Sequence, residues 1–346
     1  MTILLTGGAG YIGSHISLAL LERGSNLIVL DSFINSKLDS LDRVNRIIEE
    51  KGLFLAKSIE VIRGDIRDKN LLRKIFYNQK LAFKPIEIVV HCAGLKSVRE
   101  SVINPKRYWD VNFEGSKVLF SVMSEFDCKK IVFSSSASVY GSSSDGIFSE
   151  ESEVKPSNPY GETKLAIENL LLEISKKKYN DWKILNLRYF NPVGAHSSAL
   201  IGDDPINENR NIFPILNEVA SRKQKEFFIY GNSWNTFDGT CIRDYIHVED
   251  LAEAHVSGLD YLSKTKRNYT TLNIGTGLGT SVLELINSFK KVNKCQIPFQ
   301  YVDKRKGDVG ILIAKVDLAY RVLGWRAKKS LKDICRDNWR WQKSNF

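Results

Sequence analysis

Short runs of β-branched and aliphatic residues alternate, in the first half of the chain, with segments whose apolar residues recur every three or four positions. Such runs are typical of strands buried on both faces, and the three-to-four spacing is typical of amphipathic helices. The pattern predicts strands at residues 2–5, 27–30, 59–63, 86–91, 130–134 and 183–188, with helices between them that include residues 13–23, 69–78 and 112–125. This alternation predicts a right-handed, doubly wound parallel sheet of the α/β class.

The alternation ends after about Gly194, where polar stretches such as SSALIGDDPINENRN mix with isolated strands and helices. We therefore expect two parts that pack tightly. Residues 1–190, joined by some later segments, should form the sheet domain, and residues 191–346 a smaller mixed α/β domain that binds a substrate.

The composition is that of a protein with a large core, since 43% of the 346 residues are hydrophobic. No apolar run approaches the roughly eighteen residues that a membrane span needs, and the N-terminal MTILLTGGAG has no basic region before an apolar one. We expect a cytoplasmic protein. The five cysteines are scattered without metal-ligand spacing, which predicts reduced thiols and no metal site.

The net charge of +10 fits either a polyanionic partner or a solvated basic surface that attracts small anions. The lysines come in short groups and form no dense stripe. This favours the solvated surface, with neither nucleic acid nor membrane as a partner.

A glycine-rich turn, TGGAGYIGSH, follows the first predicted strand directly. Gly7, Gly10 and Gly13 allow a tight turn whose backbone amides can reach a pyrophosphate at the start of a helix. Asp31 ends the second strand, where a carboxylate suits the free ribose hydroxyl of NAD, and no arginine adjoins it for the phosphate of NADP. Asp65 ends the third strand within reach of an adenine. The first domain is therefore predicted to be a Rossmann-type NAD-binding domain.

The sequence NPYGETK begins another helical segment, with Tyr160 four positions before Lys164. Residues four apart lie on the same side of a helix, so the ammonium should lie near the phenol. A nearby positive charge favours the phenolate and lowers a pKa that is ordinarily about 10. The pair is a candidate base for proton transfer.

Taken together, these motifs resemble the extended short-chain dehydrogenase/reductase superfamily and, within it, the UDP-galactose 4-epimerases. The resemblance extends almost from end to end through TGGAGYIGSH, GDIRD, HCAGLKSVRES, FSSSASVYG, NPYGETK, LRYFNPVGAH, GTCIRDYIHVEDLA and NIGTG, in this order. It implies that Ser136, Tyr160 and Lys164 are catalytic. The implied reaction moves the sugar C4 hydride to NAD, giving a 4-keto sugar, and returns it to the opposite face.

The resemblance also implies the binding residues and a homodimer built through a helix bundle, here including the predicted 112–125 helix and the helix after Tyr160. The residues expected to bind NAD, with the motif residues Gly13 and Ser134 added, are Gly7, Gly10, Tyr11, Ile12, Asp31, Asn35, Ser36, Asp65, Ile66, Ala93, Gly94, Lys96, Asn112, Tyr160, Lys164 and Tyr189. The residues expected to bind the UDP-sugar are Lys96, Ser136, Tyr160, Asn191, Asn211, Ile212, Phe228, Tyr230, Arg243, Arg305, Asp308 and Leu312. The two arginines suit a diphosphate, whose oxygens accept paired charge-assisted hydrogen bonds.

Three positions depart from the family pattern. Lys306 stands where the family has glutamate, and Cys92 where it often has phenylalanine. Leu312 occupies the place of a tyrosine in members confined to plain hexoses, and of a small residue in members that also accept N-acetylated sugars. Leucine is intermediate in bulk, so UDP-N-acetylglucosamine 4-epimerase activity, alone or additional, is the nearest alternative.

Two further alternatives belong to other classes. Sugar-nucleotide dehydratases resemble the chain but have an Asp-Glu pair where Ala137 and Ser138 stand, which argues against elimination chemistry. Some members of the superfamily have become RNA-binding proteins, which the basic charge would suit. Those often lose the tyrosine or the lysine, and both are present here.

Overall fold

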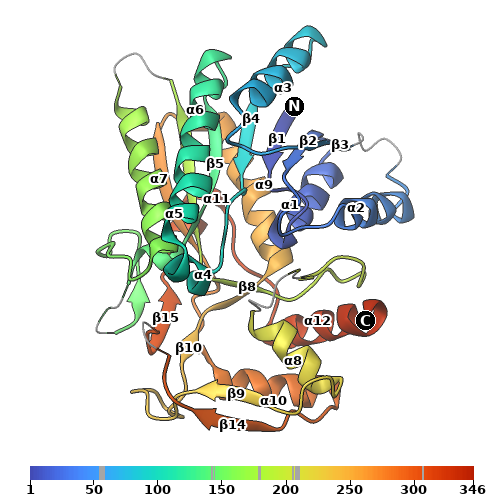
Figure 1. Ribbon diagram of the computed structural model, residues 1–346, viewed down its shortest axis with the longest axis vertical. Coiled ribbons are helices and arrows are strands. Elements are labelled where there is room, and N and C mark those ends of the chain that lie inside the picture. The colour runs from blue at the N-terminus through green and yellow to red at the C-terminus, as the bar shows by residue number, and fades with distance from the viewer. Residues whose placement is uncertain are drawn as a thin grey trace.

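A computed structural model describes residues 1–53, 59–141, 143, 145–177, 181–204, 206, 211–305 and 308–346 (Figure 1). Lys306 and part of the predicted polar stretch after Gly194 lie outside the described residues.

A seven-stranded sheet forms the centre of the larger part of the molecule, and all of its strands are parallel. In spatial order the strands are β12 (Tyr269–Ile274), β7 (Lys183–Tyr189), β5 (Lys130–Ser136), β4 (Ile88–His91), β1 (Thr2–Thr6), β2 (Asn26–Asp31) and β3 (Ile59–Arg63). All six predicted strands are present, and β12 is added from far beyond residue 190. Where the chain divides into domains stays a prediction.

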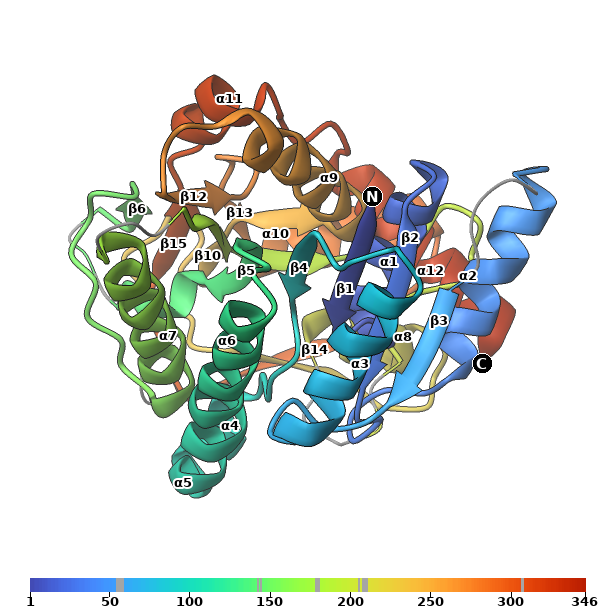
Figure 2. The same ribbon diagram turned by 90° about the horizontal axis from the view of Figure 1, so that it is seen from above.

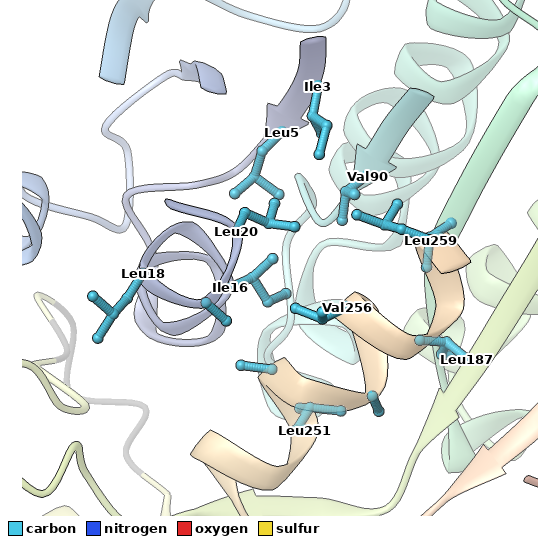
Figure 3. Close-up of a cluster of buried hydrophobic side chains, with 14 of the residues drawn as sticks. Ile3, Leu5, Ile16, Leu18, Leu20, Val90, Leu187, Leu251, Val256 and Leu259 are labelled. Atoms are coloured by element: carbon cyan, nitrogen blue, oxygen red, sulfur yellow. The ribbon is translucent and has the colours of Figure 1, made fainter. Parts of the chain in front are cut away.

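Helices cover both faces of this sheet, which confirms the predicted α/β, doubly wound class (Figure 2). One face packs against α1 (Tyr11–Glu22), α2 (Asp39–Glu50), α9 (Val248–Lys264) and α11 (Asp317–Leu323). The other packs against α3 (Lys69–Leu81), α6 (Gly115–Glu125) and α7 (Pro159–Lys176). Figure 3 shows the first core, where Ile16 and Leu20 of α1 and Leu251 of α9 lie with side chains of the sheet. These continuous apolar strands are buried because both of their faces meet helices.

The smaller part is built from short strands and three helices with a core of their own around Phe213, Leu285 and Phe289. Its helices are α8 (Ile212–Ala220), α10 (Val282–Asn293) and α12 (Leu331–Asn345). Its strand pairs are β8 (Asn191–Val193) with β11 (Tyr245–His247), and β9 (Phe227–Tyr230) with β14 (Phe299–Val302). A further sheet has the order β13 (Thr280–Ser281), β10 (Ile242–Arg243), β15 (Ile311–Ala314) and β6 (Ile147–Phe148), so a segment of the first half joins it.

Local sequence sets where the helices near the sheet edge begin. Asn158 accepts a hydrogen bond from the Gly161 amide, and Pro159 occupies the first turn, so α7 starts there with Tyr160 in that turn. The predicted helix over residues 112–125 is α6 preceded by a π-helical turn, η1 (Trp109–Glu114), which follows α4 (Val98–Ile103) and α5 (Pro105–Tyr108). No helix in the described part of the chain is both long and apolar enough to span a bilayer.

Candidate active site

A cavity of about 190 Å³ lies where the carboxyl ends of β1, β2, β3, β4, β5 and β7 meet. Ligands of doubly wound sheets bind at this edge, near the point where the strand order reverses. With one exception, Asn112, every residue predicted to bind NAD lines it: Gly7, Gly10, Tyr11, Ile12, Gly13, Asp31, Asn35, Ser36, Asp65, Ile66, Ala93, Gly94, Lys96, Ser134, Tyr160, Lys164 and Tyr189. We refer to it as the cofactor cavity.

The glycine turn at one wall of this cavity leaves no room for side chains at two of its positions. Gly7 has φ +74°, and a Cβ there would lie 2.7 Å from the Ala93 nitrogen. At Gly13 a Cβ would lie 2.1 Å from the Gly7 carbonyl oxygen. Only glycine therefore lets the α1 amino end approach the strands this closely, which leaves backbone amides to face a pyrophosphate.

Asp31 is buried at the end of β2 and is held by three donors. Its carboxylate accepts hydrogen bonds from the Ala9 amide at 3.0 Å, the Phe33 amide at 2.9 Å and the Ser36 hydroxyl at 2.8 Å. In the described part of the chain it forms no ion pair. An oriented carboxylate without a cationic partner can accept the hydroxyls of an unphosphorylated ribose, so the residues present fit NAD.

Two other residues predicted to bind NAD, Asp65 and Asn112, differ in whether they line the cavity. Asp65 lines the cavity, and its hydrogen bonds with Arg67 lower the pKa of the carboxyl. Asn112 lies behind the wall, where its side chain bonds both the amide and the carbonyl of Leu95, at 2.8 and 3.1 Å, and also Thr163. Asn112 thus ties the segment after β4 to α7.

A second cavity, of about 560 Å³, opens between the sheet edge and the smaller part of the molecule. We refer to it as the substrate cavity. Eleven of the twelve residues predicted to bind the UDP-sugar line it: Lys96, Ser136, Tyr160, Asn191, Asn211, Ile212, Phe228, Tyr230, Arg243, Arg305 and Asp308. Leu312 does not; it packs against a buried cluster that contains Phe190, which does line the cavity.

Two arginines give the substrate cavity a basic wall. The Arg305 guanidinium stacks on the Tyr230 ring, 3.6 Å from its centroid. Arg243 donates to the carbonyl of Ile242 at 2.9 Å and to that of Gly310 at 3.3 Å. Both arginines line the substrate cavity. Their guanidinium groups can therefore donate hydrogen bonds to the oxygens of a diphosphate bound there.

The two cavities share Tyr160, at the start of α7. Tyr160 is hydrogen-bonded to Ser136, the last residue of β5. The Lys164 ammonium donates to the carbonyl of Ser134 at 2.8 Å and lies 5.9 Å from the Tyr160 ring centroid. The predicted grouping of serine, tyrosine and lysine is therefore present in the structure.

The predicted direction of the Tyr160 pKa shift is wrong. Burial raises the pKa of the phenol, and the Ser136 hydrogen bond offsets this only in part. The Lys164 ammonium donates to the Ser134 carbonyl, and burial lowers the pKa of Lys164 to about 8. Desolvation therefore sets the direction of the shift in the Tyr160 pKa.

Sequence reasoning missed a buried network beside the catalytic group. The Tyr189 hydroxyl lies 2.6 Å from Ser134 Oγ and is hydrogen-bonded to Nε2 of His255 on α9. Ser134 Oγ also lies 2.9 Å from the Cys92 sulfur. His255 gave no signal because it stands inside the helix α9, three residues beyond the motif GTCIRDYIHVEDLA, and its partner Tyr189 is far away in sequence.

Among the described residues, no group of three or more histidine, cysteine, aspartate or glutamate side chains is arranged to hold a metal ion. The cysteines at 92, 128, 241, 295 and 335 are all free thiols.

Comparison with known proteins identifies the family. Residues 3–275 match the model of the NAD dependent epimerase/dehydratase family. The chain is 45% identical to UDP-glucose 4-epimerase of Yersinia enterocolitica, covering 100% of this chain and 98% of the relative, and 42% identical to UDP-glucose 4-epimerase 2 of Arabidopsis thaliana, covering 99% and 95%. The crystal structure of UDP-glucose-4-epimerase from Stenotrophomonas maltophila with bound NAD and formylated UDP-arabinopyranose superposes with a TM-score of 0.93 at 41% identity, over 99% of this chain and 98% of that one. The resemblance seen in the motifs is confirmed, and the chain belongs to the NAD dependent epimerase/dehydratase family.

Proposed function

We propose that the protein is a UDP-glucose 4-epimerase that interconverts UDP-galactose and UDP-glucose with tightly bound NAD. The observation that carries the proposal is the meeting of the two cavities at Tyr160, with Asp31 in one and two arginines in the other. The relatives and neighbouring structures support it, since they are named UDP-glucose 4-epimerases and two of the structures hold NAD together with UDP or a UDP-sugar.

In this proposal Tyr160, as phenolate, takes the proton of the sugar 4-hydroxyl and later returns it. Ser136, which bonds the phenol, orients that proton. Lys164, fixed by the Ser134 carbonyl, holds the nicotinamide ribose, and its charge together with that of the nicotinamide ring of bound NAD would favour the phenolate. Bound NAD supplies the chemistry of accepting a hydride from C4 and giving it back.

Arg243 and Arg305 bind the diphosphate, so the nucleotide stays in place while the sugar presents first one face and then the other. The substrate cavity is about three times the volume of the cofactor cavity, at 560 against 190 Å³, which supports a pocket in which a hexose can turn. After Ser136 the chain turns through η2 (Ala137–Val139), whose side chains carry no carboxylate for an elimination. This favours an epimerase over a dehydratase.

The proposal is tested by incubating the purified protein with UDP-galactose without added NAD and separating the products by chromatography. We expect UDP-glucose to form until both sugars are present. Protein shown to carry NAD that leaves UDP-galactose unchanged would contradict the proposal.

A second substrate class is favoured by one observation, the leucine at position 312 beside the cavity residue Phe190. A neighbouring structure, the UDP-Glc/GlcNAc 4-epimerase of Campylobacter jejuni, has a TM-score of 0.82 at 31% identity, over 99% of each chain. Conversion of UDP-N-acetylgalactosamine in the same assay would establish this activity, alone or as an addition.

The proposal includes a homodimer in the cytoplasm. Exposed apolar side chains gather on and next to α4, namely Val98, Val102, Ile103 and Trp109, and α4 packs against α7. Such a face suits the burial that a stable dimer needs. The free thiols suit a reducing compartment. The mass in solution, measured by light scattering with and without Val102→Asp, tests the dimer.

A further inference from the structure

A buried chain of hydrogen bonds connects α9 with the catalytic lysine. His255 Nδ1 lies 2.8 Å from the carbonyl oxygen of Leu251, one turn earlier, and its Nε2 meets the Tyr189 hydroxyl at the end of β7. That hydroxyl lies 2.6 Å from Ser134 Oγ, and the Ser134 carbonyl accepts from Lys164 at 2.8 Å. His255, Tyr189, Ser134 and Lys164 are all buried.

The Leu251 carbonyl determines which group donates and which accepts in the hydrogen bonds of His255. A carbonyl only accepts, so His255 Nδ1 must carry the ring proton. Burial lowers the pKa of His255 to about 4, so the imidazole is neutral at pH 7. Its Nε2 then carries no proton and accepts from the Tyr189 hydroxyl. The Ser134 hydroxyl donates to the Cys92 sulfur at 2.9 Å. The phenol proton of Tyr189 is therefore held between Nε2 of His255 and Ser134 Oγ.

This arrangement matters because three phenols line both cavities, Tyr11, Tyr160 and Tyr189. The Tyr11 hydroxyl already donates to the Gly194 carbonyl at 2.7 Å. A second phenol with a free proton could donate it to a phenolate or to the substrate oxygen, in competition with the reaction. Burial raises the pKa of Tyr189 well above its ordinary value, so Tyr189 keeps its proton. His255 directs that proton toward α9, which leaves Tyr160 as the phenol that exchanges a proton.

We propose that His255 is a positioning residue for the epimerase reaction: by accepting the hydrogen bond of the Tyr189 hydroxyl it reserves the proton transfer for Tyr160 and fixes the Ser134 strand end that anchors Lys164. The inference rests on the proposed function. It concerns a residue that touches neither cavity, since His255 is absent from the lining of both.

A pair of substitutions tests it. In His255→Asn the amide can still reach the Leu251 carbonyl but not Tyr189, whereas in His255→Gln a longer amide can place its oxygen near the position of Nε2. We expect kcat to fall about tenfold in the asparagine variant with KM changed less than about twofold, because a misplaced reacting group costs rate more than binding. The glutamine variant should recover most of the wild-type kcat.

A double-mutant cycle shows whether His255 acts through Tyr189. We expect Tyr189→Phe to lower kcat by a similar factor, and the double variant His255→Asn/Tyr189→Phe to be no slower than Tyr189→Phe alone. Tyr261→Phe is the matched control: it removes a hydroxyl on the same helix, bonded to Thr270 at 2.8 Å, and should keep the wild-type kcat.

Three results would overturn the inference: wild-type kcat in Tyr189→Phe, equal kcat in the asparagine and glutamine variants, or additive losses in the double variant. If the asparagine variant does not fold, it will show no cooperative melting transition. In that case the kcat of Tyr189→Phe, compared with that of Tyr261→Phe, still tests whether the Tyr189 hydroxyl is needed. A wild-type protein unable to convert UDP-galactose would instead contradict the proposed function, so the two failures are distinguishable.

Discussion

The cofactor cavity and the substrate cavity are built in different ways. The first is framed by the ends of six parallel strands, and two of the three hydrogen bonds that hold Asp31 come from backbone amides. The second has about three times the volume, and its lining combines residues of the sheet edge with strands, loops and α8 of the smaller part. Sheet topology therefore positions the cofactor, whereas the packing of separate segments positions the substrate. Substitutions in the cofactor cavity should affect NAD retention. Substitutions in the substrate cavity should affect the affinity for the sugar nucleotide.

The largest effect is expected where the two cavities meet. Tyr160→Phe removes the only group proposed to exchange a proton with the sugar, so kcat should fall by roughly 10³-fold, within the usual range for loss of a general base. Both binding functions should survive, because the phenyl ring still fills the same space. A coupled assay for UDP-glucose gives kcat, and the absorbance of nucleotide released on denaturation gives the NAD content. A variant that also lost its NAD would show that the Tyr160 hydroxyl is needed to retain the cofactor in addition to exchanging the proton.

The second prediction concerns the cofactor cavity alone. Asp31→Ala removes the proposed ribose acceptor and leaves the Ala9 and Phe33 amides without their partner. A hydrogen bond to a charged group contributes about 1.5–3 kcal/mol, so NAD should bind roughly 10- to 100-fold more weakly. Activity should return to near wild type when NAD is added in excess. Equilibrium dialysis with NAD measures the affinity.

Asp42→Ala, which removes an exposed acid in the first turn of α2, is the control for this change in charge. It should retain NAD as the wild type does. Equal losses in the two variants would mean that net charge, and not the orientation of Asp31, holds the cofactor.

The two cavities also differ in how far the sequence predicts them. The strand pattern, the glycine turn and Asp31 lie in consecutive strand–helix units, so spacing alone placed them at one sheet edge. Arg243 and Arg305 are far apart in sequence and follow no periodicity, so only the family resemblance brought them together. β12 and His255 were missed because their positions depend on tertiary packing. The Tyr160 pKa shift was predicted wrongly because the sequence does not show how deeply a side chain is buried.

The third prediction concerns the basic wall of the substrate cavity. Arg305 is exposed and stacked on Tyr230, so its attraction for a diphosphate is partly screened by water. Arg305→Ala should raise the KM for UDP-galactose about tenfold at low salt and leave kcat and NAD content unchanged. Steady-state kinetics at two ionic strengths measures this.

Lys304→Ala is the matched control, since Lys304 bonds the Ser233 carbonyl and does not line the cavity. Its KM should change less than about twofold, as for an exposed charge. If Arg305→Ala lowered kcat instead of raising KM, the arginine would act on the reacting sugar. The substrate cavity would then contribute to catalysis as well as to binding.

The smallest effect is expected at Leu312, which stands behind the substrate cavity. Its side chain packs against the buried cluster that contains Val139 and Phe190, so shortening it relaxes the wall without removing a lining group. We expect Leu312→Ala to keep the rate on UDP-galactose within about threefold and to raise the relative rate on UDP-N-acetylgalactosamine by tenfold or less, the range typical of a small change in pocket volume. Chromatography of both reactions gives the ratio. Equal rates on the two sugars would mean that this position sets the substrate range from outside the cavity, and that the packing behind the substrate cavity matters as much as its lining.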